Sequence, residues 1–579
     1  MTGPSHYDVI VVGTGMTGMS FGLQVLTRHP GKRVLLLDKH HLAGGYATSF
    51  TRGECNYDCS LHKLAGIKRG NTRRILESLN VYNDLNIKHH ETYFSIRHKD
   101  LLFDLPEDAD GFCAALKDRF PEDAAGIDRF HEDIVVHGKD GYNQFRMMSG
   151  DYVPNLKTLR YAHKHYKHLT VLDALNQRFK NPLVREICGA PCIYAGGLSE
   201  DLSYLYYLHI LYASMVCGTG YVQGGAQYLS DTFVKHIQQR GGEVVLRVNV
   251  QEVLLDDAGT AYGIRTSDGT YFAKDVVLNC SPHYAFSSLI AEHHRPEKVL
   301  SSLEQLRPSW STTTLYLELL DSPSALGLPH GETMLISDDT EAGLQHRRRL
   351  ASAEDYELGF WEHSPMMITN YHDLDPGGGN VVCLNVLDSF DHWPKRKTPD
   401  YRPWKTKCAE VILNRFRRAF PEAAARVKRT NLATPHTYER YTNNFKGAGY
   451  GAMVGTDISG HSFHYNMPLK RLHFMSSWVA GPSYEAAMGY AEMRCKYFFV
   501  QNDEPAKTAP AAVAAPAVLS APAAVAAPAE YTAHITPAVH IAPIAPITPA
   551  EPILLPHRSA DRAPDKLSAN QWPDVQAAS

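Results

Sequence analysis

The glycine-rich stretch GTGMTG, residues 13–18, constrains the fold of this chain more than any other feature. It follows a short β-branched run, Asp8 to Val12, and it opens a segment, Met16 to Arg28, that can form a helix. The apolar run KRVLLLD then ends at Asp38. This order of strand, glycine turn, helix and strand predicts a βαβ unit that binds a dinucleotide, because the helix N-terminus offers free N–H groups to a pyrophosphate.

Each glycine of the turn has an expected task. Gly13 permits the tight turn, Gly15 lets the backbone approach a pyrophosphate, and Gly18 lets helix and strand pack closely. Asp38 lies twenty residues beyond Gly18, at the end of the next strand, where a carboxylate accepts hydrogen bonds from a ribose diol. A carboxylate there disfavours a 2′-phosphate, so the turn predicts NAD or FAD rather than NADP.

The composition limits which binding partners and which cellular compartment the sequence predicts. The 579 residues carry a formal net charge of −4, which favours neither nucleic acid nor an anionic membrane as a bulk partner. The ten cysteines have no C-x-x-C spacing, and the first expected strand starts near Tyr7, leaving no room for a secretory signal. We therefore predict a cytoplasmic protein. His163, His165 and His168 have no acidic or cysteine partners at ligand spacing, so no metal site is predicted.

Residues beyond the first turn favour FAD over NAD. The stretch DKHHLAGGYATSF, from Asp38, resembles the acid-x(5)-G-G continuation that passes along FAD in phytoene desaturases, carotenoid isomerases, retinol saturases and amine oxidases. NYDCSLHKLAG, residues 56–66, is similar to the F-D-x-G-x-H segment of these flavoproteins. TPHTYERYTNNFKGAGYGAM, from Thr434, is similar to a block of retinol saturases and carotenoid isomerases. The chain thus resembles the phytoene desaturase-like family of FAD-dependent oxidoreductases, nearest its carotenoid isomerase and retinol saturase branch.

The resemblance implies an α/β fold, in which a Rossmann-type FAD-binding domain of the glutathione reductase-like kind holds an inserted α+β substrate domain. The expected FAD-binding part is residues 1–100, 216–306 and 437–500, and the substrate part is residues 101–215 and 307–436. The run EVVLRVNVQEVLLD, residues 243–256, is expected to form one strand of the FAD-binding part. Residues 501–579, rich in Pro and Ala, predict a disordered tail that could dock a partner.

The resemblance also implies the residues that contact FAD. These are Gly13, Gly15, Gly18, Asp38, Lys39, Gly44, Gly45, Tyr46, Val250, Ser477 and Gly481. One position departs from the family, because the last block has Ser476-Ser477 where many relatives carry a glycine and an acid near the ribityl chain. A serine hydroxyl there still offers a hydrogen bond, and a helix that starts near Pro482 aims its N–H groups at the flavin O2.

Three residues are candidates for the chemistry. His62 could protonate a polyene carbon after hydride delivery, hold the flavin edge, or only hydrogen-bond the backbone. Tyr484 could face the substrate from the start of the closing helix. Glu485, beside it, is either a catalytic acid or a carboxylate that complements the helix dipole, and the second role is the preferred one.

The predicted activity is hydride transfer between flavin N5 and a carbon of a hydrophobic conjugated polyene, an isoprenoid or a polyene polyketide, with reduction or reductive cyclisation favoured. Desaturation, cis-trans isomerisation, and a non-catalytic FAD-binding polyene carrier remain alternatives, and NAD(P)H is an open choice of electron donor. The apolar aromatic stretch from Ser203 to Met215 is either a core helix or a tunnel wall. The basic amphipathic stretch from Asn155 to Leu172 leaves peripheral membrane contact open.

Overall fold

The computed structural model describes residues 6–340, 359–458, 460–461, 463–464 and 467–502. The chain divides into two units, Met1–Val518 and Leu519–Ser579, and every described residue belongs to the first. The predicted disordered tail, residues 501–579, lies outside the described residues apart from its first two.

The first sheet carries the glycine turn. Its strand order is β10-β2-β1-β13-β12-β11, with β19 also beside β13. The parallel part joins β1 (His6–Val12) to β2 (Val34–Asp38) on one side and to β13 (Thr270–Leu278) on the other. Helix α1 (Met16–Arg28) connects β1 to β2, which confirms the predicted strand, turn, helix and strand. The outer strands are β10 (Glu243–Leu246), β11 (Val250–Leu255), β12 (Ala261–Thr266) and β19 (Leu472–Phe474).

The single strand predicted over residues 243–256 is wrong, because the chain breaks there into β10 and β11. Arg247 lies in the left-handed region with φ 63°, which interrupts the extended backbone. Its N–H donates to the carbonyl of His40, and the N–H of Val248 donates to the carbonyl of Asp38. The chain therefore wraps over the end of β2, and the apolar run continues on the far side of the sheet.

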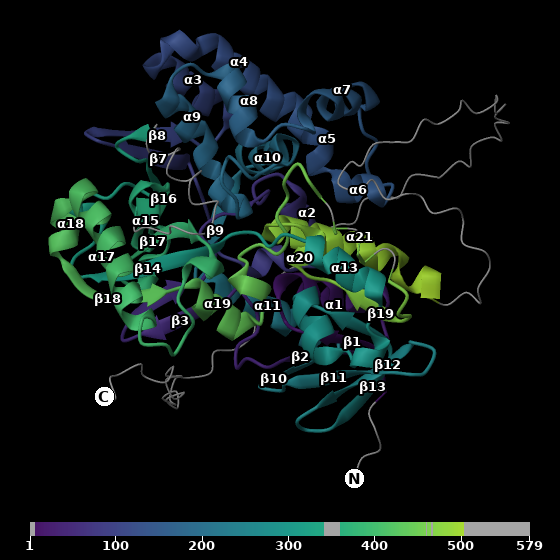
Figure 1. Cartoon of the computed structure of the whole chain (residues 1–579). Helices are drawn as coiled ribbons and strands as arrows, with labels where there is room; N and C mark the ends of the chain where they lie inside the picture. Colours follow the sequence, from purple (N-terminus) through teal and green to yellow (C-terminus); the bar gives the residue numbers. More distant parts are fainter. Residues whose placement is uncertain (1–5, 341–358, 459, 462, 465–466, 503–579) are drawn as a thin grey trace, which may run out of the picture. The chain divides into compact units, whose positions relative to one another are not determined.

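A second sheet, in the order β18-β14-β17-β16-β15-β7-β8, lies in the left part of Figure 1. Its core is β14 (Ser311–Leu319), paired along its length with β17 (Val381–Asp388) and β18 (Val427–Ala433). Strand β15 (Glu332–Leu335) lies between β16 (Met366–Asn370) and β7 (Thr92–His98), and β8 (Leu101–Pro106) is the edge. Smaller pairings involve β3 (Ser49–Arg52), β4 (Cys55–Asp58), β5 (Leu64–Ala65), β6 (Ile87–His89) and β9 (Thr219–Val222).

A group of helices, drawn in blue in the upper part of Figure 1, comes from the middle of the first half of the chain. It comprises α3 (Ala109–Arg119), α4 (Ala124–Glu132), α5 (Gly138–Tyr142), α6 (Gln144–Met148), α7 (Leu156–Tyr166), α8 (Val171–Arg178), α9 (Pro182–Gly189) and α10 (Tyr204–Leu211). Helix α10 is buried over nearly its whole surface, so the predicted aromatic stretch is interior structure. The basic amphipathic stretch forms α7, which buries only Ala162 and Tyr166.

The remaining helices pack on the two sheets or connect them. They are α2 (Asn71–Ser78), α11 (Gly225–Gln239), α12 (Pro282–Tyr284), α13 (Glu297–Gln305), α15 (Gly359–His363), α16 (Tyr371–Leu374), α17 (Tyr401–Ala419), α18 (Pro421–Ala425), α19 (Pro435–Thr442), α20 (Ser477–Ala480) and α21 (Tyr484–Asn502). Helix α21 packs along α1 and α2, and the end of the described chain lies at the C-terminal end of α1, where Phe499 contacts His29. No helix among the described residues is both long enough and apolar enough to cross a membrane.

Candidate cofactor and active site

The side chain of Asn279, the residue after β13, packs against the glycine turn and hydrogen-bonds it. Asn279 Nδ2 donates to the carbonyls of Gly13 and Gly15, at 3.2 and 3.0 Å. A Cβ on Gly18 would come within 2.5 Å of the same nitrogen, so Gly18 lets the helix meet the strand as expected. Gly13 has φ +101°, which confirms the expected tight turn. Asn279 holds the carbonyls back and thereby leaves the N–H groups at the start of α1 facing the turn.

The start of α1 suits an anion. Gly15 is the N-cap, no side chain caps the helix, and the first turn holds no acidic residue. Asp38 stands beside it at the end of β2, where one carboxylate oxygen accepts from the N–H and the hydroxyl of Thr14, both at 2.8 Å. The other oxygen accepts from the N–H of His40 at 2.9 Å. Because a carboxylate offers about four acceptor positions, Asp38 keeps room for a hydroxyl from a ligand.

The predicted continuation from Gly44 to Tyr46 returns to the glycine turn. Gly44 forms an isolated parallel bridge with Gly15, and a Cβ on Gly45 would lie 3.3 Å from the Cα of Gly15. The Tyr46 hydroxyl donates to the carbonyl of Ala448 at 3.0 Å, which ties this segment to the late part of the chain.

Two further residues predicted to contact the cofactor follow β2 and begin β11. Lys39 hydrogen-bonds Asn443, and burial lowers the pKa of its ammonium against the opposing charge of Asp38. Val250 is buried at the start of β11, two residues after Val248, whose N–H donates to the carbonyl of Asp38.

Ser476 and Ser477, which stand where many relatives carry a glycine and an acid, place a buried hydroxyl in this part of the fold. Ser476 caps α20, is 5% exposed, and its Oγ has no hydrogen-bond partner. Ser477 is the first residue of α20 and is half-buried. Gly481, with φ +89°, then ends this short helix. A buried hydroxyl without a partner is costly unless a ligand or water completes it, so the serine pair offers the hydrogen bond that the usual acid would make.

His62 is part of a buried charged cluster that spans both halves of the fold. Its Nδ1 lies 2.5 Å from Oε1 of Glu332, the first residue of β15. The second carboxylate oxygen of Glu332 pairs with Lys63 and accepts from the Tyr194 hydroxyl at 2.8 Å. Tyr194 also stacks on the His62 ring, with centroids 5.5 Å apart.

The charges of this cluster compensate one another. Burial alone would raise the pKa of Glu332, but the nearby Lys63 and His62 outweigh it and hold that pKa below its ordinary value. Burial lowers the pKa of Lys63, and Glu332 opposes the change. Glu332 therefore stays ionised, and its Oε1 accepts a hydrogen bond from Nδ1 of His62, so that Nε2 is the ring nitrogen that Glu332 does not contact.

Tyr484 connects the closing helix to the same region. Ser60 Oγ donates to the carbonyl of Tyr46 at 2.7 Å, so the Tyr484 hydroxyl, also 2.7 Å from Ser60 Oγ, donates to that serine. Burial raises the pKa of Tyr484 far above its ordinary value. The phenol therefore acts as a fixed hydrogen-bond donor and not as a titrating group.

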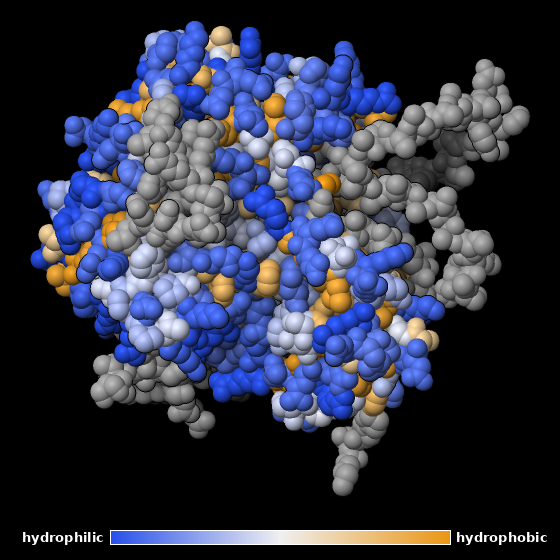
Figure 2. Space-filling model, viewed as in Figure 1, coloured by the Kyte–Doolittle hydropathy of each residue, from blue (hydrophilic) through white to orange (hydrophobic). Residues whose placement is uncertain are grey.

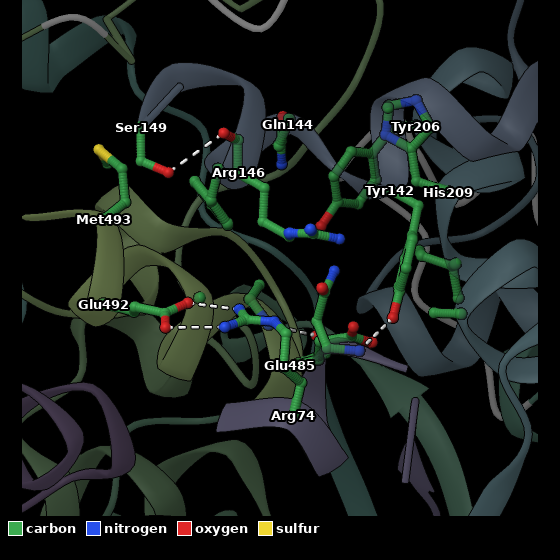
Figure 3. A pocket seen from close by; sticks show the side chains of 18 residues that line it. Arg74, Tyr142, Gln144, Arg146, Ser149, Tyr206, His209, Glu485, Glu492 and Met493 are labelled. Carbon is green, nitrogen blue, oxygen red and sulfur yellow. Dashed lines mark hydrogen bonds and ion pairs between the residues drawn. The ribbon is translucent and has the colours of Figure 1, made fainter. Parts of the chain in front are cut away.

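Glu485 differs from its preferred expected role. It is buried, and burial raises the pKa of its carboxyl from 4.5 to about 8, although hydrogen bonds from Tyr142 and Asn71 oppose the rise. A carboxyl that is neutral at pH 7 has no charge with which to complement the helix dipole. Figure 3 shows Glu485 at the floor of a pocket, beside Arg74 and below Tyr142 and Tyr206.

Comparisons with known proteins agree with this geometry. Residues 11–79 match the family model described as an NAD(P)-binding Rossmann-like domain. All-trans-retinol 13,14-reductase from Macaca fascicularis is 24% identical over 485 residues, which cover 78% of this chain and 78% of the relative. A chloroplastic prolycopene isomerase from Arabidopsis thaliana is 22% identical over 78% of this chain and 75% of its own length. Cyclohexylamine oxidase from Brevibacterium oxydans shares the fold, with 15% identity, a TM-score of 0.52, and coverage of 86% and 99%.

The fold and the turn define a dinucleotide-binding oxidoreductase of the Rossmann type. More specifically, the chain is similar to FAD-dependent oxidoreductases of the phytoene desaturase-like kind, as its retinol reductase and prolycopene isomerase relatives indicate. The residues present fit FAD: the uncapped start of α1, the acceptor positions of Asp38 and the unpaired hydroxyl of Ser476 offer partners to a pyrophosphate, a ribose and a ribityl chain.

The roles of two residues central to this site, Asn279 and Glu332, could not be predicted from the sequence. Asn279 was visible only as part of the run VVLNCSP, and its contacts with the turn join residues 264 and 266 positions apart. Glu332 has no motif around it, and it meets His62 from a different sheet. Only the pairing of β15 with β7 and β16, which the sequence pattern did not predict, brings this acid to the predicted histidine.

Proposed function

We propose that this protein uses FAD to reduce a carbon–carbon double bond of a hydrophobic conjugated polyene. The observation that carries the proposal is the buried pair of His62 and Glu332, because saturation of a double bond needs a proton donor and isomerisation consumes no proton. The two relatives named above act, by name, on all-trans-retinol and on prolycopene, which supports a long apolar substrate.

Bound FAD would supply the hydride. In the proposed site Gly13, Gly15 and Gly18 would bring the start of α1 to the pyrophosphate, and Asp38 would accept a hydrogen bond from the ribose. Lys39 and Val250 would hold the adenosine half, and Gly44 to Tyr46 would line the cofactor further along. Ser476, Ser477 and Gly481 would hold the flavin end. These roles follow from the family resemblance and from the packing of each residue around the turn or the closing segment.

The residues of the chain would then serve to deliver the proton. Glu332 accepts the hydrogen bond from Nδ1–H of His62 and fixes the orientation of the ring. The protonated ring would give its Nε2 proton to the carbon next to the one that takes the hydride, and would be left as a neutral imidazole. Tyr484 fixes the segment around Ser60 through its hydroxyl. Tyr206 and Tyr207 are buried on α10, and Tyr194 is half-buried against the His62 ring. These aromatic rings would help to exclude water from an oily substrate.

Isomerisation is the second candidate, and the prolycopene isomerase relative favours it. Desaturation would be the reverse reaction, in which the flavin takes a hydride from the substrate and His62 acts as the base that takes the proton. A non-catalytic polyene carrier would bind FAD and a polyene without turnover. NAD(P)H is the proposed donor of electrons for the reductive direction.

Peripheral membrane contact would give an oily substrate a source. Helix α7 exposes Leu156 and Tyr161, Val153 precedes it with 88% of its surface exposed, and Lys157 and Lys164 stand among them. The face drawn in Figure 2 is otherwise mostly hydrophilic with scattered hydrophobic residues.

The test is anaerobic turnover of the purified holoprotein with all-trans-retinol and with prolycopene as probes, with NADPH or NADH as donor. Reduction predicts a product that has gained a pair of hydrogen atoms. A product of unchanged composition but altered double-bond geometry would assign isomerisation, and loss of hydrogen would assign desaturation.

A further inference from the structure

A pocket of about 60 Å³ lies at the N-terminal end of α21, between that helix and α2, α5, α6 and α10. Figure 3 shows its labelled side chains converging from these elements. Gln144 and Arg146 at its rim are half-buried, and Ser483 is exposed, so the pocket opens to solvent. At about 15 Å³ for each water, it has room for about four water molecules.

Three buried polar atoms of the pocket residues have no hydrogen-bond partner among the residues that the structure describes. They are Oε1 of Glu485, Nδ1 of His209 and Nε of Arg74. Glu485 is 8% exposed and His209 is 9% exposed. Buried polar atoms are nearly always satisfied, and three around one small cavity point to a cluster of water that completes them.

Glu485 is the pocket carboxyl that can gain and lose a proton near neutral pH, and few uncompensated charges around it would oppose either state. Arg74 makes a two-pronged ion pair with Glu492, in which the charges cancel. Burial lowers the pKa of His209 to about 4, so this ring is neutral, and Arg146 at the rim bonds Asn143 and the carbonyl of Asp151. Burial raises the pKa of the Tyr142 and Tyr206 phenols, which remain protonated.

The carboxyl of Glu485 also touches the segment that leads to the proposed active site. A Cβ on Gly66 would lie 2.9 Å from Oε2 of Glu485, and Gly66 follows His62 by four residues. The residue before Glu485 is Tyr484, whose hydroxyl reaches Ser60. The preceding Ser483 has φ 99°, an unusual conformation for a serine that turns the chain sharply at the mouth of the pocket. Glu485 therefore separates a solvent-connected pocket from the residues expected at the flavin.

We propose that this pocket is a hydrated proton inlet and that Glu485 is the relay residue through which the active site takes protons from solvent. The inference rests on the proposed reductive function. Reduction of a double bond adds a hydride, with both electrons, to one carbon and a proton to the next. The Glu485 carboxyl gives one proton toward the site for each double bond reduced, and the resulting carboxylate takes one proton from pocket water, which bulk solvent replaces.

The first test needs neither substrate nor turnover. Infrared spectroscopy of the holoprotein should show the carbonyl band of a protonated carboxyl at pH 6, and Glu485→Gln should remove it. On transfer to D₂O this band should shift within the mixing time. Ala486→Leu, which places bulk in the pocket from the next residue of α21, should slow that shift at least tenfold. Glu77→Gln, a change at an exposed carboxylate of α2 that does not line the pocket, should leave the band and its exchange in place.

The second test uses all-trans-retinol or prolycopene, whichever the wild type reduces. Glu485→Gln should slow reduction of the polyene about a hundredfold while the rate of flavin reduction by the pyridine nucleotide stays unchanged. The proton inlet would be refuted if the infrared band of the Glu485 carboxyl were absent at pH 6. It would also be refuted if that band exchanged in D₂O as slowly as the backbone amides of the core. An Ala486→Leu variant with raised KM and unchanged exchange would refute it too, since the pocket would then hold the polar end of the substrate. If the wild type reduces no polyene, the exchange result still stands, so the two proposals fail separately.

Discussion

Replacing Glu485 with glutamine should change how the stability of the folded protein depends on pH. The pKa of this carboxyl is about 8 in the folded protein and 4.5 in its ordinary environment. Because the folded pKa is the higher one, the proton is held more tightly in the folded state. The stability that this proton gives is complete below pH 4.5 and is lost as the pH rises through 8.

The size of the effect follows from the shift. Each pKa unit is worth about 1.4 kcal/mol, so the full loss over the window is about 5 kcal/mol, and roughly half of it falls between pH 5.5 and 7.5. Glutamine has nearly the same shape and does not titrate. The free energy of unfolding of Glu485→Gln, relative to wild type, should therefore rise by about 2 to 3 kcal/mol over that interval.

Urea unfolding of both holoproteins at a series of pH values, followed by circular dichroism, measures this difference directly. Other titrating groups are common to both proteins and cancel. Parallel curves across pH 5.5 to 7.5 would mean that Glu485 is ionised in the folded protein, and the argument for a neutral buried carboxyl would be refuted.

Three further outcomes are expected. Glu332→Gln should lower the rate of polyene reduction about a hundredfold and move the pH profile of that rate, since the carboxylate no longer holds the proton of His62; Glu107→Gln, a matched change at a second buried carboxylate paired with Lys68, should leave the profile in place. Asn279→Ala should weaken FAD binding about tenfold, measured by fluorescence titration of the apoprotein, because two turn carbonyls lose their donor; unchanged affinity would remove Asn279 from the cofactor site. Leu156→Ser should reduce cosedimentation with anionic vesicles severalfold, and equal binding of variant and wild type would assign any membrane contact elsewhere.

The cofactor half of this protein could be predicted because its information is local. The turn at Gly13, the helix from Met16 and the acid at Asp38 lie within one short unit, in which each residue type is suited to its neighbour's geometry. The break at Arg247 was missed since it depends on hydrogen bonds to the end of β2, more than two hundred residues earlier in the chain.

The catalytic half was harder to predict for the same physical reason. His62 could be singled out from its motif, but its partner Glu332 is 270 residues away and belongs to the other sheet. The charge of Glu485 is set by burial, which sequence alone does not give, so a helix-dipole role was the natural expectation. Spacing along the chain finds the residue types that a site needs, whereas their partners and their protonation come from tertiary packing.

The central claim is that the chain reduces a polyene with FAD, and one anaerobic titration tests it most directly. NADPH or NADH is added to the purified holoprotein until the flavin absorbance bleaches, and all-trans-retinol, then prolycopene, is added in the absence of oxygen. If the chain reduces a polyene, the bleached flavin recovers its absorbance in step with a product that has gained a pair of hydrogen atoms. A reduced flavin that stays bleached, with either polyene unchanged in hydrogen content, would contradict it.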